Sequence, residues 1–380
     1  MKKQRWVWNT QVSECSCIRC GSRYEADEYP TGCPRCLELG YPASMKLEYE
    51  GLTEENSSSS CLHKRLPFLD VPTLGEGNTP LIHLERLAEQ LGIHRFWVKN
   101  EGMNPTGSHK DRMSPLVIAR ALQLGKSSVV VASSGNAGIS LAAYASFAGL
   151  QCTVITTKDI HEDVKKSIQA YGAQLVMVSD SFQRWELTRE LAENQGFYPA
   201  TNYMFPPVGS NMYGVQGYKT IAYELVQQLK GCSPSVILVP SSRADLLWGV
   251  WEGLKEASAS GWIKKLPKMV AVEPFPRLVR VLQGSDYRGE FTGSTSLKSI
   301  AGTTVTYQGL LAIRESEGTA VAVSDEEAQM AQKELAAHGL YLELSSAAVL
   351  AAAKRLIKIN FMSEEDQAVA IGTAQGLKKI

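Results

Sequence analysis

Short runs rich in β-branched residues alternate with amphipathic segments along the chain, and this alternation limits the folds it can adopt. Strand-like composition is found at 127–132, 152–157, 174–179, 235–239 and 269–272. Helical periodicity is found at 111–124, 137–147, 162–171, 182–194 and 218–229. Strands and helices that alternate at this spacing form parallel sheets with helices on both faces. The sequence therefore predicts an α/β fold whose functional loops follow the carboxyl ends of strands.

The composition is that of a folded chain with more than one domain. Its 380 residues correspond to about two or three domains. The 39 Lys and Arg balance the 39 Asp and Glu, which argues against binding nucleic acid or anionic membrane through bulk charge. No apolar run reaches the roughly 20 residues that cross a bilayer, and the basic start has no apolar region behind it. We therefore expect a cytoplasmic protein without nucleic-acid or membrane partners.

Five of the eight cysteines fall within the first 36 residues, which is unlike a disulfide framework spread over a long chain. Two Cys-x2-Cys pairs, Cys17 with Cys20 and Cys33 with Cys36, are separated by twelve residues. Each pair can turn two thiolates toward one point, so the four predict the closed tetrahedral site of a zinc ribbon. This Zn2+ would be structural.

Other interpretations of the cysteines stay open. Cys15 is a further thiol that can replace a neighbouring ligand, and an iron site has similar spacing. The pairs can also be redox-active or incidental cysteines. Gly21 and Gly32 beside the pairs predict tight turns that need a permissive backbone. Ordinary packing or surface roles are expected for Cys61, Cys152 and Cys232.

Two polar segments stand where loops lead into helices. In the segment SSGNAG at 133–138, free N–H groups and hydroxyls favour an anion, and Asn136 adds an amide for a phenolate or carbonyl oxygen. In KNEGMNPTGSHKDR at 99–112, Lys110 is predicted to stand at a helix start. The helix dipole and neighbouring cations there favour its neutral, nucleophilic form. The alternatives are a solvated surface lysine and an ordinary N-cap.

Together and in this order, the motifs resemble fold-type II pyridoxal-phosphate (PLP) enzymes, most closely the threonine synthase family. The matching segments, from about Gly75 to the C-terminus, are GEGNTPLIHLERL, KNEGMNPTGSHKDR, SSGNAG, GLLAIRESEGTAVAVSDEE and GTAQGLK. The resemblance implies a tryptophan synthase β-like α/β fold of two doubly wound parallel-sheet domains plus a small N-terminal zinc ribbon. The expected organisation is a ribbon at 1–50, a linker at 51–74, a large PLP domain of 75–105 and 205–380, and a small domain of 106–204.

The resemblance also implies roles for individual residues. Lys110 would form the internal Schiff base with PLP and later move the α-proton of the substrate. Asn136 would bond the 3′-oxygen of the cofactor, and Thr373 would set a neutral hydroxyl against its pyridine nitrogen. Candidates for holding the substrate carboxylate or phosphate are Ser133, Ser134 and Gly135. Candidates for a distal substrate phosphate are Lys99 and Thr106. Glu343 matches an acidic residue of the family without a defined role. Members are commonly dimers, so we expect a homodimer.

The first departure from the family is the loop after the strand that ends at Pro240. Relatives have a glycine-rich or Gly/Asn-rich loop there, whose N–H groups cradle the PLP phosphate. This chain has no glycine before Gly249, and we expect Arg243 to bind the phosphate by a charge-assisted pair. The expected hydroxyl donors are Ser241 and Ser242, with Asp245 turned away or paired to the arginine.

The second departure lies at 211–220, where threonine synthases carry NPYRLEGQKT and this chain carries NMYGVQGYKT. The family's arginine, which contacts the phosphate of O-phosphohomoserine, is replaced by Gly214, and its glutamate by Gln216. Either Arg243 or Lys99 compensates, or the substrate differs. His109, before the lysine, is a packing substitution or an added acid/base group.

Three functions are therefore open. The first is a PLP-dependent lyase that converts a phosphorylated amino acid, O-phospho-L-homoserine, into L-threonine by phosphate elimination and water addition. The second is β-elimination or β-replacement on O-phosphoserine, serine or a related amino acid, which the Gly214 change favours. The third is a catalytically silent paralogue, against which the intact Lys110, Asn136 and Thr373 argue.

Overall fold

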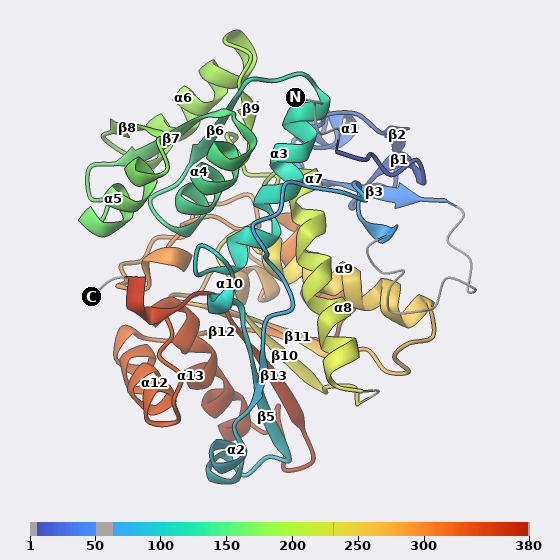
Figure 1. The fold of residues 1–380 in the computed structure, drawn as a ribbon. Helices are drawn as coiled ribbons and strands as arrows, with labels where there is room; N and C mark the ends of the chain where they lie inside the picture. Colours follow the sequence, from blue (N-terminus) through green and yellow to red (C-terminus); the bar gives the residue numbers. More distant parts are fainter. Residues whose placement is uncertain (1–5, 51–63, 231, 379–380) are drawn as a thin grey trace. The chain divides into compact units, whose positions relative to one another are not determined.

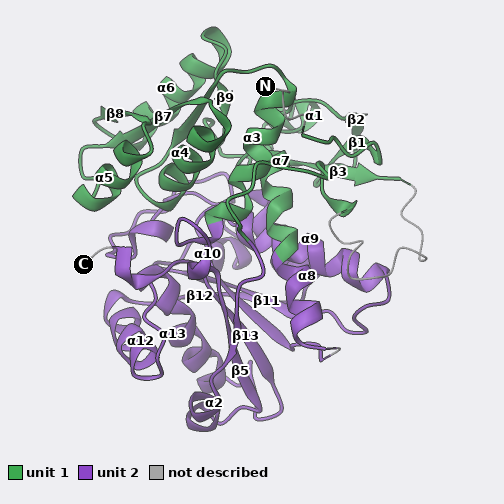
Figure 2. Ribbon diagram, viewed as in Figure 1, with its two compact units in different colours: residues 1–76, 110–220 green, residues 77–109, 221–380 purple. Residues whose placement is uncertain are grey.

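The computed structural model describes residues 6–50, 64–230 and 232–378, so residues 51–63 of the linker predicted at 51–74 lie outside the described residues. The chain forms two compact units (Figure 2). Unit 1 comprises Met1–Glu76 and Lys110–Thr220, and unit 2 comprises Gly77–His109 and Ile221–Ile380. These bounds group the cysteine-rich N-terminus with the middle of the chain, and the predicted division into ribbon, linker, small and large domains stays a prediction. The described helices include none with the length and apolarity of a membrane span.

The N-terminal part of unit 1 is a three-stranded antiparallel sheet with the strand order β2-β1-β3. Its elements are β1 (Val12–Cys17), β2 (Arg23–Glu25), α1 (Pro34–Glu38) and β3 (Met45–Tyr49). The predicted glycine turns are confirmed, because Gly21 has a φ of 69° and Gly32 a φ of 76°. A side chain at Gly32 would also lie 2.4 Å from the carbonyl oxygen of Ala43. We call residues 6–50 the cysteine module.

The rest of unit 1 is built on a parallel sheet with the order β8-β7-β6-β9 (Figure 1). Its strands are β6 (Ser128–Ala132), β7 (Gln151–Thr157), β8 (Gln174–Val178) and β9 (Tyr198–Pro199). The helices that pack on it are α3 (Ser114–Gln123), α4 (Asn136–Ala148), α5 (Glu162–Ala170) and α6 (Ser181–Asn194). Two short turns, α7 (Met212–Val215) and η5 (Gln216–Tyr218), lead into α8 (Lys219–Gln228), which crosses the unit boundary.

Unit 2 contains a six-stranded sheet with the order β12-β11-β10-β13-β5-β4, parallel except for β4 at its edge. The strands are β4 (Leu81–His83), β5 (Arg95–Asn100), β10 (Val236–Pro240), β11 (Lys268–Glu273), β12 (Thr319–Ala322) and β13 (Gln367–Gly372). The helices are α2 (Glu85–Leu91), α9 (Asp245–Ala259), α10 (Leu278–Leu282), α11 (Tyr307–Glu315), α12 (Asp325–Ala337) and α13 (Leu344–Lys358). Shorter turns are η3 (Glu101–Met103), η4 (His109–Arg112, at the unit boundary), η6 (Lys298–Ile300) and η7 (Gly376–Lys378).

Both faces of this sheet are buried, as expected for parallel strands. Val236 and Leu238 of β10 belong to one apolar core together with residues of α2, α12 and α13. Ile237 and Val239 point to the opposite face and are also fully buried. The predicted α/β fold with helix-covered parallel sheets is confirmed, and the five predicted strands and five predicted helices all form within a few residues of their expected bounds.

Candidate active site

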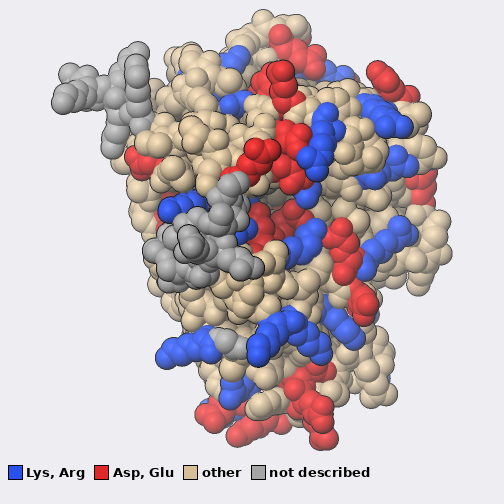
Figure 3. All heavy atoms as spheres, turned by 90° about the vertical axis from the view of Figure 1, so that its right-hand side faces the viewer, with Lys and Arg blue, Asp and Glu red and all other residues tan. Residues whose placement is uncertain are grey.

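The predicted site residues are divided between the two units. Unit 1 carries Lys110 and the 133–136 loop, and unit 2 carries Lys99, Thr106, the 241–243 loop and Thr373. Lysine, arginine and carboxylate side chains are interspersed over the face shown in Figure 3, in agreement with the net charge of zero.

Lys110 lies in η4, a 3₁₀ turn that precedes the first helical residue, Ser114. The prediction that it stands at a helix start is therefore imprecise, because a separate turn intervenes and the helix dipole acts mainly within the first turn. Its Nζ donates a hydrogen bond to the hydroxyl of Tyr218, at 3.1 Å. This partner is 108 residues away along the chain, and no local motif indicates it.

The loop between β6 and α4 is closed by its own first serine. The hydroxyl of Ser133 accepts hydrogen bonds from the N–H groups of Gly135, at 3.2 Å, and Gly138, at 3.1 Å. Ser133 therefore has a structural task in addition to its predicted contact with substrate. Asn136 is the first residue of α4 and is half-buried.

Arg184 of α6 is a basic residue at this loop that sequence reasoning missed. Its Nη1 donates to the exposed hydroxyl of Ser134, at 3.0 Å. The same hydroxyl also accepts a bond from Thr156 at 3.1 Å. A guanidinium beside Ser134 strengthens the predicted preference of this loop for an anion. The pattern of charged residues along α6 does not indicate that Arg184 contacts Ser134.

The glycine-free loop of unit 2 is turned by an alanine. Ala244 has a φ of 63°, a left-handed conformation that usually favours glycine. The carbonyl oxygen of Arg243 accepts bonds from Thr306, at 2.6 Å, and from the amide of Gln308, at 3.3 Å. Gln308 also donates to the carboxylate of Asp245, at 2.7 Å, so Asp245 is held by a neutral amide.

The side chains of this loop differ in what they can still bind. The hydroxyl of Ser241 is buried and donates to the carbonyl oxygen of Val239, at 2.9 Å. Ser242 and Arg243 are half-buried. Burial lowers the pKa of the Arg243 guanidinium, and the nearby Asp245 charge opposes that shift. An anionic ligand would favour the charged form in the same way.

A buried arginine holds this loop from the side. Arg277 donates from Nη2 to the carbonyl oxygen of Ser241, at 2.7 Å, and from Nη1 to that of Gly302. Its charge is paired with Glu273, at 3.3 Å, and both side chains are fully buried. The Glu273 carboxylate also accepts the backbone N–H of Arg277, at 2.8 Å, and that of Leu278, at 3.0 Å.

Thr373 follows β13, and its hydroxyl lies 2.6 Å from that of Ser346 in α13. The Ser346 oxygen already accepts the N–H of Ala374, at 2.9 Å, so its own hydrogen can point to Thr373. The Thr373 hydroxyl can then donate outward. The carbonyl oxygen of Thr373 accepts the backbone N–H of His109, at 2.8 Å, and lies 3.1 Å from Nδ1 of the His109 imidazole ring. Since a carbonyl only accepts, Nδ1 carries a hydrogen, and His109 anchors the chain before Lys110.

Lys99 is enclosed by acceptors of its own unit. Its side chain is fully buried, and Nζ donates to the carbonyl oxygen of Thr79 at 2.7 Å, to Glu224 at 2.5 Å and to Gln228 at 2.9 Å. A contact between Lys99 and a substrate phosphate would need these bonds to break. Thr106 is also buried. Ser108, two residues before Lys110, has a fully buried hydroxyl without a hydrogen-bonding partner among the described residues.

Gly214 of α7 packs directly against α3. A Cβ built on it would lie 2.7 Å from a methyl carbon of Val117 and 2.8 Å from Cγ of Met113. A side chain at this position, including the arginine of the threonine synthase motif, has no room unless the Val117 and Met113 side chains shift. In this chain, the Val117 and Met113 side chains therefore occupy the space next to residue 214 that a larger side chain would need.

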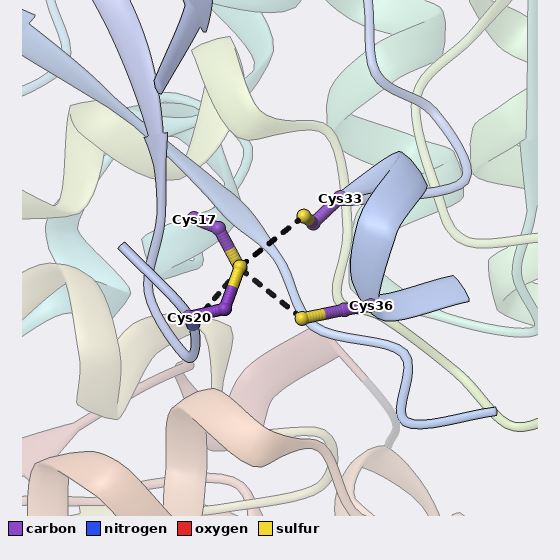
Figure 4. A group of neighbouring side chains, drawn as sticks. All are labelled: Cys17, Cys20, Cys33 and Cys36. Carbon is purple, nitrogen blue, oxygen red and sulfur yellow. Dashed lines mark hydrogen bonds between the residues drawn. The ribbon is translucent and has the colours of Figure 1, made fainter. Parts of the chain in front are cut away.

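The thiols of Cys17, Cys20, Cys33 and Cys36 point toward one another in the cysteine module, all within 4.8 Å (Figure 4). The sulfur atoms of Cys17 and Cys36 are 3.6 Å apart, and those of Cys20 and Cys33 are 3.7 Å apart. Tetrahedral zinc thiolates place sulfur atoms about 3.8 Å from one another, so the donor set fits this metal. Cys15 is not part of the group, and burial raises the pKa of its thiol to about 12.

The comparisons with known proteins agree with the fold and the motifs. The family model of pyridoxal-phosphate dependent enzymes matches residues 72–374. The threonine synthase of Methanocaldococcus jannaschii is 34% identical over 95% of this chain and 92% of its own length. That of Mycobacterium leprae is 33% identical over 80% of this chain and 83% of its own.

Solved structures show the same fold at lower identity. O-ureido-L-serine synthase has a TM-score of 0.66 at 24% identity and covers 80% of this chain and 90% of its own. The diaminopropionate ammonia lyase of Escherichia coli has a TM-score of 0.68 at 19% identity, over 85% of this chain and 88% of its own.

The fold, the lysine segment and the family match define a PLP-dependent enzyme of fold type II, a lyase by its relatives. Within that class, the chain belongs to the threonine synthase family.

Proposed function

We propose that this chain eliminates phosphate from O-phospho-L-homoserine and adds water to give L-threonine. The observation that carries the proposal is the similarity to the Methanocaldococcus threonine synthase, which extends over 95% of the chain. A cytoplasmic location and a homodimer remain part of the proposal.

The chain's own residues would divide the work as follows. PLP, when bound, withdraws electrons from the α-carbon of an amino acid and so makes its proton acidic. Lys110 would carry the cofactor and then move that proton, while Asn136 would hold the 3′-oxygen. Thr373 would donate its hydroxyl hydrogen to the pyridine nitrogen. Ser346 can donate to the Thr373 oxygen, which leaves the Thr373 hydrogen for that bond.

The anionic groups would be held by different loops. The PLP phosphate would contact Ser242 and Arg243, with Ser241 shaping the backbone because its hydroxyl is already bonded. The substrate carboxylate would contact Ser134 and Gly135, with Arg184 as an added positive charge. The predicted contributions of Ser133 and Thr106 stay part of this proposal. We leave Lys99 out, because its ammonium already has three oxygen partners.

A second candidate function is favoured by Gly214. Because α3 fills the space that the family's arginine needs, the distal phosphate of O-phosphohomoserine loses a contact worth about 1.5–3 kcal/mol. A shorter donor such as O-phospho-L-serine, which would undergo β-elimination or β-replacement, does not need that contact.

Phosphate release decides between the two. The purified, PLP-loaded protein is mixed with O-phospho-L-homoserine or O-phospho-L-serine, and phosphate and the amino-acid products are measured. Phosphate together with threonine from the first donor supports the proposal; release from the second donor alone supports the alternative. Lys110→Ala is the control, and it should lose both the absorbance of lysine-bound PLP and all release. A wild-type protein that binds PLP but acts on neither donor would favour the silent paralogue.

We also propose that the four clustered thiols hold a structural zinc ion. Metal analysis should find about one zinc per chain, lost in Cys33→Ser and kept in Cys152→Ser, whose thiol lies outside the group. Gentle chelation should lower the melting temperature while the absorbance of lysine-bound PLP persists. Loss of that absorbance on chelation would contradict a purely structural role.

A further inference from the structure

The turn that contains Tyr218 approaches the lysine segment unusually closely. A Cβ on Gly217 would lie 1.8 Å from the carbonyl oxygen of Arg112, so only glycine allows this approach. Arg112 donates from Nη1 to the hydroxyl of Thr220, at 3.1 Å, and that hydroxyl donates to the carbonyl oxygen of Gly217, at 2.7 Å. The 216–220 segment and Arg112 at the end of η4 are therefore fixed to one another within unit 1.

This attachment brings a phenol to the reactive amine. Tyr218 is fully buried, and its hydroxyl accepts a bond from Nζ of Lys110 at 3.1 Å. Nζ also lies 5.5 Å from the centre of the ring. The Tyr218 hydroxyl is 3.5 Å from Sδ of Met113, a weak acceptor for its hydrogen. The phenol oxygen thus accepts from Lys110 while its own hydrogen points to Met113.

The residue is a departure from the family pattern. In the threonine synthase motif NPYRLEGQKT, a glutamine stands where this chain has Tyr218, and the flanking Gly217 and Lys219 are unchanged. A glutamine side chain is also able to accept a hydrogen bond through its amide oxygen, but it is flexible and has no ring. The tyrosine combines an acceptor with a rigid, well-packed support.

We infer that Tyr218 is a positioning residue that fixes the direction of the Lys110 amine for its reaction with the aldehyde of PLP. A neutral amine that donates one N–H to the phenol keeps its lone pair pointing away from it. In that reaction, the Lys110 nitrogen would form a C=N bond with the aldehyde carbon, and the aldehyde oxygen would leave as water with both amine hydrogens. The inference rests on the proposed role of Lys110 as the residue that carries PLP.

The test follows uptake of PLP by the cofactor-free protein and needs no substrate. Tyr218→Phe keeps the ring and removes the acceptor, while Tyr218→Gln restores an acceptor of the family's type. Tyr213→Phe is the matched control: Tyr213 is equally buried in the preceding turn, and its hydroxyl donates to the carbonyl oxygen of Asp27, at 3.0 Å. Pyridoxine 5′-phosphate, which has no aldehyde, measures cofactor affinity without the covalent step.

In Tyr218→Phe, lysine-bound PLP absorbance should form about tenfold more slowly, while the Kd for pyridoxine 5′-phosphate stays within about twofold. Tyr218→Gln should recover part of the rate, and Tyr213→Phe should match the wild type. An unchanged rate in Tyr218→Phe, or a parallel loss of pyridoxine phosphate affinity, would overturn the inference. If Lys110→Ala still forms the absorbance, the role of Lys110 itself fails, whatever Tyr218 does.

Discussion

Two strand–loop–helix turns, one in each unit, are candidates for binding anions, and they are built in opposite ways. The 133–135 loop contains Gly135 and is closed from inside, because the Ser133 hydroxyl accepts two of its own N–H groups. The 241–244 loop contains no glycine and is held from outside, through bonds from Arg277 and other side chains to its carbonyl oxygens.

The difference shows how a turn without glycine can be held. Glycine lets a backbone turn and approach an anion without help from the rest of the protein. A loop of serine, arginine and alanine needs a charge to attract the anion and distant side chains to hold its turn. Substitutions far from the 241–244 loop should therefore affect it strongly, whereas the 133–135 loop should respond mainly to changes within itself.

The largest effect is expected from Arg277→Met. It removes the support of the Ser241 and Gly302 carbonyls and leaves the Glu273 carboxylate buried without its counter-charge. Breaking such a pair costs about 3–5 kcal/mol of unfolding free energy, measured by urea denaturation. Arg277→Lys keeps the charge without the two-pronged donor and should lose less. Equal stability of Arg277→Met and wild type would show that the loop does not depend on this support.

Arg243→Ala removes the charge of the 241–244 loop and leaves the bonds that hold its backbone in place. The bonds from Thr306 and Gln308 reach the carbonyl oxygen of residue 243, so alanine preserves them. PLP affinity should fall about tenfold or more, because a charge-assisted contact to phosphate is lost. Arg288→Ala, at a half-buried arginine paired with Asp286 outside this loop, is the control and should bind PLP normally. Unchanged affinity in Arg243→Ala would refute our account of the phosphate site.

Ser133→Ala tests the internally closed loop. The N–H groups of Gly135 and Gly138 lose their acceptor, which should reduce the unfolding free energy by about 1–2 kcal/mol, similar to the loss of a helix cap. Ser134→Ala removes an exposed hydroxyl and should change stability less. If the two variants are equally stable, Ser133 does not close the loop in solution.

The sequence predicts these two loops with different success. The positions of both follow from β-branched strands, since 128–132 and 236–240 form where expected. The four clustered cysteines were also predictable, because their ligand spacing is local. The left-handed turn at Ala244 was not, because alanine carries no signal for it.

Contacts that join distant segments lie further beyond local patterns. Arg184 meets Ser134 across 50 residues, and Lys110 meets Tyr218 across 108. Neither separation has a periodicity to read. The burial of Lys99 was missed for the same reason, since its partners Glu224 and Gln228 come from α8, more than 120 residues later.

The smallest effect is expected from Ala244→Gly, and it depends on the way Ala244 is accommodated. Gly309 in α11 faces it, and a Cβ at Gly309 would lie 2.7 Å from the Cβ of Ala244, with its other neighbours at 3.6 Å. Gly309→Ala should therefore destabilise the protein by about 1–3 kcal/mol through overpacking. Ala244→Gly should stabilise it by about 0.5–1 kcal/mol, because relief of the left-handed strain exceeds the entropy cost of glycine.

The double variant tests whether the effects of the two substitutions depend on one another. With Ala244→Gly in place, the clash at 309 disappears, and Gly309→Ala should become stabilising by up to about 1 kcal/mol through helix propensity. Thermal unfolding of the four proteins gives this coupling as a double-mutant cycle. Additive effects would mean that residues 244 and 309 are not held this close. Gly309 would then not be what makes room for Ala244 in the glycine-free loop.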